Sequence, residues 1–133
     1  MTKPTPIVIA HWATRVLTAG VLAMGAIPKF TGGAAALAEK LPGGNAAVIA
    51  IGVAELAAIG LMFIPRLTLV GSALAAMIML GAVASHIVGP VGMEGDFASM
   101  FIMALVALAS AVAASVLAWR RGMLPRLPKP SPV

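Results

Sequence analysis

Few residues of this chain could do chemistry, and two of those few interrupt stretches that are otherwise apolar. Arg15 lies within the first apolar stretch, and Glu55 lies within the second, in the segment GVAELAAIGLMFIP. The sequence contains no cysteine and no tyrosine, so thiol nucleophiles, disulfides and cysteine-based metal sites are excluded. Two histidines and four acidic residues therefore remain for acid–base or metal chemistry.

Arg15 and Glu55 are expected at matching depths in two neighbouring antiparallel helices. Arg15 lies about eight residues into its stretch, roughly 12 Å at the rise of an α-helix, and Glu55 lies about nine residues from the same face, roughly 13 Å. The other acids, Glu39, Glu94 and Asp96, are expected at the opposite face. The sequence therefore predicts an intramembrane ion pair between Arg15 and Glu55, because pairing offsets much of the free energy that each buried charge would cost alone.

Two further polar residues share the helical face of Arg15. His11 lies one turn before it and Thr18 lies three residues after it. Together with Glu55 they form a predicted polar cluster in one half of the membrane. This cluster could fix the register of two helices, or it could line a cavity that receives a ligand or a proton. His11 taken alone is interpreted as an interfacial residue rather than a ligand.

A second polar group is expected at the opposite face. Lys29 ends the first stretch and His86 lies near the end of the third, at a height similar to that of Glu94 and Asp96. A histidine with two nearby acids could bind a divalent metal, but ordinary interfacial snorkelling is the favoured interpretation, and no metal site is predicted. His11 and His86 are expected roughly 20 Å or more apart, so they cannot ligate one haem.

Four apolar stretches must position these residues. The chain is 61% hydrophobic and only 10% charged, whereas a soluble domain has about 25% charged residues. A helix that crosses the hydrocarbon needs about 20 apolar residues, and stretches of that length lie at residues 7–27, 46–64, 67–88 and 97–119. The sequence therefore predicts an all-α fold, an integral membrane antiparallel four-helix bundle, as one domain over residues 1–120.

Turn and capping residues refine these boundaries. Pro28 is expected to end the first helix, and Asp96 is a plausible N-cap of the fourth. Arg120 and Arg121 would complement the dipole at the C-terminus of the fourth helix. Between the first two stretches, the segment AAALAEKL predicts a short surface helix that ends before Pro42.

The charged residues divide between the two faces of the membrane. One side is expected to carry Lys3, Arg66, Arg120, Arg121, Arg126 and Lys129. The other side is expected to carry Lys29 and Lys40 beside Glu39, Glu94 and Asp96. Cytoplasmic segments are enriched in Lys and Arg, so both termini are predicted to be cytoplasmic, with Trp12 and Trp119 at that interface.

This topology also explains the net charge of +5 without a nucleic-acid partner. The Pro-rich basic tail at residues 121–133 is expected to contact a lipid surface or a partner. The predicted location is a multi-pass position in the bacterial inner membrane. The expected partners are the bilayer and another membrane or redox protein, or a second copy of the chain.

Three segments resemble a known family. They are AGVLAMGAIPKF after an arginine in the first helix, IGVAELAAIGLMFIP in the second, and GSALAAMIMLGAVASHI in the third. Together they resemble the DoxX-like family of small four-helix membrane proteins, over roughly residues 12–88. That family takes its name from the membrane subunit of a thiosulfate:quinone oxidoreductase. The resemblance carries over Arg15, Lys29 and Glu55, and it transfers no catalytic residue.

The functional hypotheses follow from the polar cluster and from this resemblance. The leading one is an accessory or quinone-associated subunit of a membrane redox complex, with a quinone headgroup near His11, Arg15 and Glu55. Quinone is the one cofactor considered, and whether the protein is an enzyme stays open. The alternatives are a purely structural or assembly subunit of a larger membrane complex and a small-solute transporter. Transport is less favoured because the sequence shows no inverted repeat.

Overall fold

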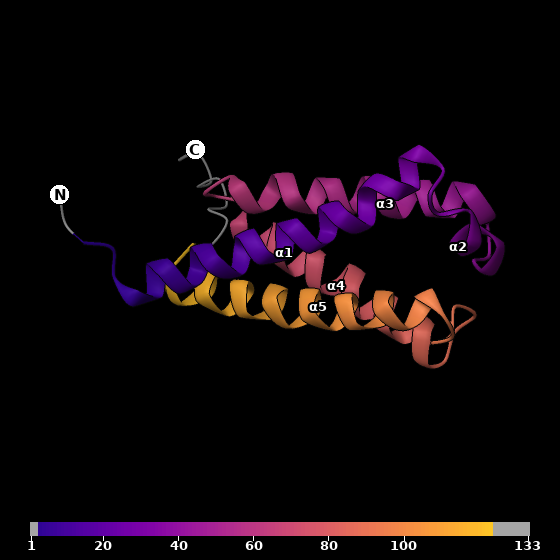
Figure 1. Ribbon diagram of the computed structural model, residues 1–133. Helices are drawn as coiled ribbons and strands as arrows, with labels where there is room; N and C mark the ends of the chain where they lie inside the picture. Colours follow the sequence, from indigo (N-terminus) through magenta and orange to yellow (C-terminus); the bar gives the residue numbers. More distant parts are fainter. Residues whose placement is uncertain (1–2, 124–133) are drawn as a thin grey trace, which may run out of the picture.

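A computed structural model of the 133-residue chain describes residues 3–123, and it is helical (Figure 1). The helices are α1 (Pro6–Thr31), α2 (Ala35–Lys40), α3 (Gly44–Phe63), α4 (Thr68–Ile87) and α5 (Asp96–Arg120). The four helices other than α2 are long and apolar enough to cross a membrane. The all-α prediction with four apolar helices is therefore confirmed for this part of the chain.

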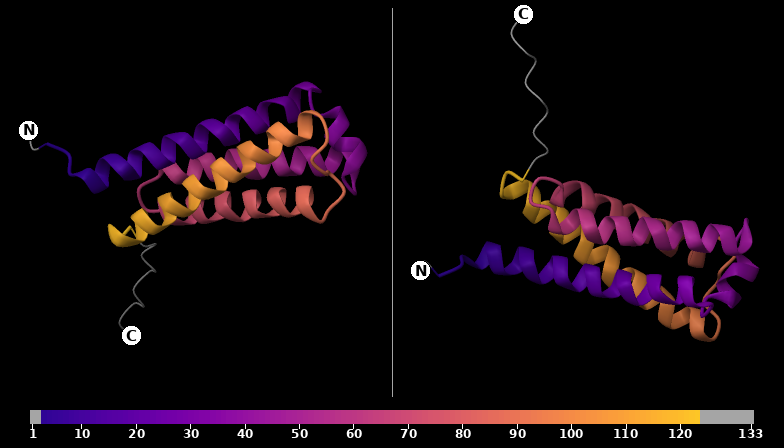
Figure 2. Two further views of the ribbon diagram at one scale, coloured as in Figure 1. Left: turned by 60° about the horizontal axis from the view of Figure 1, so that its bottom comes forward. Right: turned by 90° about the horizontal axis from the view of Figure 1, so that it is seen from above.

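The four long helices form an antiparallel ring. Helix α1 packs against α3 and α5, and α4 packs against the same two helices from the other side, so α1 and α4 lie diagonally opposite (Figure 2). The start of α1, the turn at residues 64–67 and the end of α5 share one end of the bundle, here called the terminal end. Helix α2 packs on α3 at the other end, here called the loop end.

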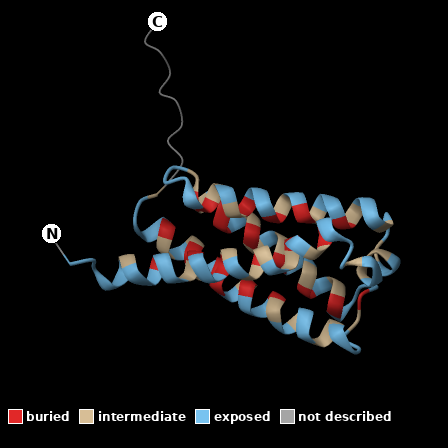
Figure 3. Cartoon of the chain, turned by 45° about the horizontal axis from the view of Figure 1, so that its top comes forward, coloured by how far each residue is buried: buried red, intermediate tan, exposed pale blue. Residues whose placement is uncertain are grey.

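Buried residues lie on the helix faces that point into the bundle, and exposed residues lie on its outside (Figure 3). Alanine is frequent among the buried residues, and many large apolar side chains are exposed. The core cluster consists of Leu22, Ala58, Ala75, Met79, Val83, Ala104, Ala107 and Ala111. On the outside, by contrast, Met77 is 71% exposed and Met24 is 66% exposed. This distribution suits a bundle whose solvent is hydrocarbon, since small residues let the helices approach and the lipid accepts the larger side chains.

Gly71 sets the approach of α4 to α3. A Cβ at this position would lie 2.7 Å from the carbonyl carbon of Leu61 and 2.9 Å from the carbonyl oxygen of Ala58. Both neighbours are backbone atoms, which cannot swing aside. The short turn between α3 and α4 therefore depends on a residue without a side chain.

Two sequence-based boundaries are wrong. Helix α1 continues through Pro28 to Thr31 and ends at Gly32, whose φ of 81° is left-handed. A proline removes its own N–H bond, and so close to a helix end that loss does not stop the helix. Asp96 is the first residue of α5 rather than its cap, which is Gly95. Its carboxylate still lies in the first turn, where the helix dipole favours negative charge.

The other boundaries agree closely with prediction. Helices α3, α4 and α5 each begin and end within two residues of the predicted limits. The short helix α2 is present, and its C-cap is Leu41, directly before Pro42. Arg120 lies in the last turn of α5, as predicted. The predicted tail contacts fall mostly on residues 124–133, which lie outside the described residues.

Candidate functional site

Glu55 forms its ion pair with Lys29, so the prediction that it pairs with Arg15 is wrong. Lys29 Nζ donates to Glu55 Oε2 at 2.8 Å and to Oε1 at 3.0 Å, and it donates to the carbonyl of Gly25 at 2.8 Å. Glu55 is 3% exposed and Lys29 is 9% exposed. These three bonds occupy all three ammonium protons, whereas the carboxylate oxygens keep lone pairs for further donors.

The direction of the side chains explains this pairing. Helical side chains lean toward the N-terminus of their own helix. Because α1 and α3 are antiparallel, Lys29 leans back toward Gly25 while Glu55 leans toward the loop end, and the two charges converge. Arg15 leans toward the terminal end, away from Glu55. The sequence-based prediction compared only the depths of the two backbone positions, so it missed this divergence.

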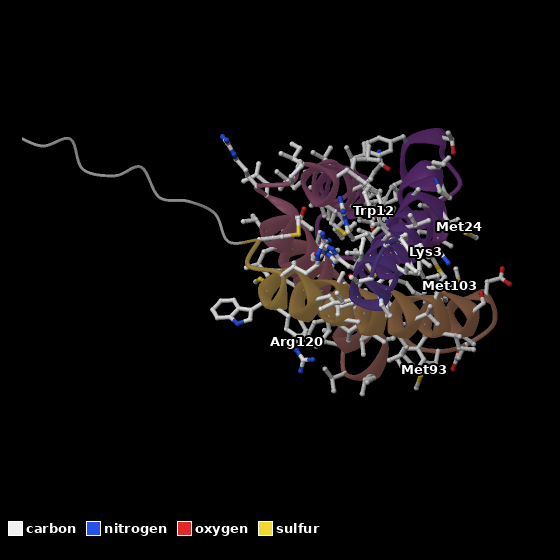
Figure 4. All side chains as sticks on the ribbon, turned by 90° about the vertical axis from the view of Figure 1, so that its left-hand side faces the viewer. Lys3, Trp12, Met24, Met93, Met103 and Arg120 are labelled. Atoms are coloured by element: carbon white, nitrogen blue, oxygen red, sulfur yellow. The ribbon has the colours of Figure 1, made fainter. Side chains whose placement is uncertain are left out.

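A cavity of about 490 Å³ lies beside the Lys29–Glu55 pair, and all four long helices and α2 contribute to its lining. Its walls are mostly apolar and rich in methionine: Met24, Met77, Met79, Met100 and Met103. Met24 of α1 and Met103 of α5 are labelled in Figure 4. Met24 and Met77 are largely exposed on the outside of the bundle, so the cavity reaches the apolar outer surface.

His86 lines the cavity together with Glu55. Its Nδ1 lies 2.6 Å from the carbonyl oxygen of Gly92. Since a carbonyl only accepts hydrogen bonds, Nδ1 carries the proton, and in the neutral ring Nε2 is then an acceptor. The loop that follows α4 thus fixes the tautomer of His86.

The hydroxyl groups in the same lining already use their protons. Ser85 donates to the carbonyl of Ala82 and Ser99 donates to the carbonyl of Asp96, both at 2.7 Å. With the Lys29 protons also occupied, the polar groups left to meet a ligand are acceptors. The cavity is therefore suited to an apolar molecule that carries hydroxyl or amine donors.

The predicted group at the loop end is only partly assembled. Lys29 and His86 line the same cavity. Glu94 and Asp96 instead line a separate hollow with Lys40. Within residues 3–123, no group of three or more His, Asp or Glu side chains is placed to hold a metal ion.

The predicted cluster of His11, Arg15 and Thr18 forms a buried face of α1, but it does not include Glu55. Thr18 Oγ1 lies 2.8 Å from the hydroxyl of Ser110 on α5. The four residues predicted as one site therefore belong to two, one near each end of the bundle.

Arg15 contacts the end of α3 at the terminal end of the bundle. Its Nη2 donates to the carbonyl of Met62, one of the last carbonyls of α3. Its guanidinium carbon lies 4.4 Å from the ring centre of Trp12 and 4.9 Å from that of Phe63. Sequence reasoning missed this contact because an acceptor on the backbone leaves no signal in the sequence.

None of the protein-family models, curated proteins and solved structures compared with this chain matches it. The DoxX-like resemblance therefore stays a prediction. Of the three residues it carries over, Lys29 and Glu55 form the buried pair and Arg15 stands apart. The class that the fold defines is a helical bundle with four candidate membrane-spanning helices.

Proposed function

We propose that this protein is a quinone-associated accessory subunit of a membrane redox complex, and that its cavity holds the reduced, hydroxyl-bearing form of the quinone. The observation that carries the proposal is the cavity itself, in which Glu55 and His86 are polar acceptors in a methionine-rich apolar wall. Ligand pockets of this kind commonly have volumes of about 300–1,000 Å³, with a small number of polar groups that orient the ligand.

The hydrogen-bonding pattern favours a quinol over a quinone. A quinol carries two hydroxyl donors, which match the free lone pairs of Glu55 and the Nε2 of His86. A quinone carries only acceptors, and the nearby Lys29 protons are already bonded. Flexible methionine side chains can adapt to the ring and its apolar tail, which would enter where Met24 and Met77 meet the lipid.

Filling the cavity tests the proposal. Gly81 lines the cavity, and a Cβ added there meets no atom within 4 Å. Gly81→Leu should therefore fold and abolish binding of a short-chain benzoquinol, measured by anaerobic titration into the protein in lipid nanodiscs. Gly60→Leu is the matched control, because Gly60 is equally open but does not line the cavity. Equal binding by both variants would refute the site.

His86→Asn tests the role of the ring nitrogen. The asparagine amide can still donate to the carbonyl of Gly92, as Nδ1 does. The side chain of asparagine has no counterpart of the acceptor Nε2. We expect the thermal midpoint to change little and benzoquinol affinity to fall by about tenfold, the loss of one good hydrogen bond. The matching benzoquinone should bind more weakly than the quinol to the unmodified protein, and the reverse order would contradict the assignment.

The same variants separate the alternative functions. A purely structural or assembly subunit would bind no quinol and would retain partner proteins equally with Gly81→Leu and Gly60→Leu. A small-solute transporter would show solute flux into vesicles that Gly81→Leu blocks.

The bilayer proposed for this protein is the bacterial inner membrane, with the terminal end in the cytoplasm. Support comes from the charges, because Arg66, Arg120 and Arg121 gather at the terminal end. The loop end instead carries Glu39, Glu94 and Asp96. This asymmetry follows the rule that cytoplasmic segments are rich in Lys and Arg.

A further inference from the structure

The terminal end of the bundle contains a second polar cluster, which the proposed function does not use. His11 is fully buried and Arg15 is 3% exposed. Arg121, at the end of α5, donates from Nη1 to His11 Nδ1 at 2.6 Å. We call His11, Arg15 and Arg121 the basic cluster.

No acidic side chain balances the basic cluster. The sequence has four acids, of which Glu39, Glu94 and Asp96 belong to the loop end. The fourth, Glu55, is held by Lys29. The carbonyl of Met62 and two aromatic rings meet part of the Arg15 guanidinium, but they carry no full negative charge.

Two buried nitrogens of the cluster are unsatisfied. Within the described residues, His11 Nε2 and Arg15 Nε have no hydrogen-bond partner. Because Arg121 donates to Nδ1, the neutral His11 ring carries its proton on Nε2, so both unsatisfied atoms are donors. Buried donors without acceptors are rare in folded proteins, and an ion or an ordered water is one kind of partner that satisfies them.

We infer that the basic cluster binds a phosphate group, supplied by an anionic lipid of the leaflet at the terminal end. Phosphate offers several charged acceptors, and guanidinium groups match its geometry. The height is suitable, because Met62 lies in the last turn of α3 and the exposed Trp12 and Trp119 mark the interface at this end. Arg121 is exposed, so a headgroup at the membrane surface can contact the outermost member of the cluster directly.

The test compares phosphate sources on the purified full chain in neutral detergent. Phosphatidylglycerol, phosphatidylcholine and inorganic phosphate are added separately, and bound lipid is read by native mass spectrometry alongside the thermal midpoint. We expect retention of phosphatidylglycerol and an upward shift of the midpoint. Arg121→Gln should weaken this binding by about tenfold or more, the loss of a charge-assisted hydrogen bond.

Arg120→Gln is the matched control. It removes the same charge from the neighbouring residue, whose side chain points away from the bundle in Figure 4. If Arg121→Gln and Arg120→Gln lose phosphatidylglycerol binding equally, the effect is one of surface charge and the inference is overturned. It is also overturned if no phosphate source binds. Stabilisation by inorganic phosphate that Arg121→Gln alone abolishes would support the phosphate site and assign it a soluble ligand. Arg15→Gln should also abolish phosphate binding. If Arg15→Gln does not fold, the comparison of Arg121→Gln with Arg120→Gln decides the test.

Discussion

At the scale of single residues, the Lys29–Glu55 pair has the largest consequences. Both side chains are buried, and the charge of each is offset by the opposite charge of the other. Removing one partner of such a pair typically costs about 3–5 kcal/mol, because the remaining charge is left buried and unpaired. Replacing both partners by well-packed hydrophobic residues of similar volume often leaves the stability unchanged or raises it.

We therefore predict that Lys29→Met lowers the free energy of unfolding by about 3–5 kcal/mol. The double variant Lys29→Met/Glu55→Gln should recover most of that loss. The measurement is reversible unfolding in mixed micelles, and Lys40→Met on the exposed α2 is the control for losing one lysine. If the effects of Lys29→Met and Glu55→Gln on the free energy of unfolding simply add in the double variant, the two side chains are not energetically coupled.

The residue scale is also where the sequence was least informative. Hydropathy identified Arg15 and Glu55 as buried charges, and both are buried. Their partners could not be derived from it, because the choice depends on side-chain direction and on backbone acceptors such as the carbonyl of Met62. The sequence also could not identify Ser110 and Arg121 as partners of α1, because the sequence of α5 does not indicate which residues of α1 they face.

At the scale of helices, close backbone contact joins α3 to α4. Apolar runs of membrane-spanning length predicted four helices, and the structure has them within a few residues. Their order around the bundle follows from short connections, but the depth of each contact depends on individual small residues. Gly71 is the tightest such position, because a Cβ added there would clash with backbone atoms of α3.

Gly71→Ala should lower the free energy of unfolding by about 3 kcal/mol, at the upper end of the usual effect of overpacking, because the clash is with backbone. Gly60→Ala, where the same methyl meets no atom within 4 Å, should instead be stabilising by about 0.5–1 kcal/mol. Unfolding midpoints of the two variants check this pair. A tolerated Gly71→Ala would show that α4 can shift away from α3.

The contact of α1 with α5 includes the hydroxyl pair of Thr18 and Ser110. A double-mutant cycle with Thr18→Val and Ser110→Ala should give a coupling energy of about 0.6 kcal/mol, the average found for hydrogen bonds between membrane helices. Ser115→Ala is the control, because the Ser115 hydroxyl bonds to Ala111 of its own helix and not to Thr18, whereas the Ser110 hydroxyl bonds both to Ala107 of its own helix and to Thr18. Coupling between Thr18 and Ser115 as large as that between Thr18 and Ser110 would assign the effect to helix packing.

At the scale of the whole molecule, the polar groups fall into two separate sites along one apolar bundle. The cavity with Lys29, Glu55 and His86 lies toward the loop end, and the basic cluster lies at the terminal end. A phosphate at the basic cluster would anchor one end in the headgroup layer while the cavity stays at hydrocarbon depth. The orientation of the bundle decides which leaflet supplies that phosphate.

The orientation can be read by cysteine labelling, because the chain has no cysteine of its own. Pro65→Cys reports the terminal end and Met93→Cys reports the loop end, and both positions are exposed. Neither substitution changes the charges that set topology. In intact bacterial cells, a membrane-impermeant maleimide should label Met93→Cys and leave Pro65→Cys unlabelled until the membrane is opened. The reverse pattern would place the arginine-rich end outside, against the positive-inside rule, and would make the outer leaflet the source of the phosphate bound by Arg15 and Arg121.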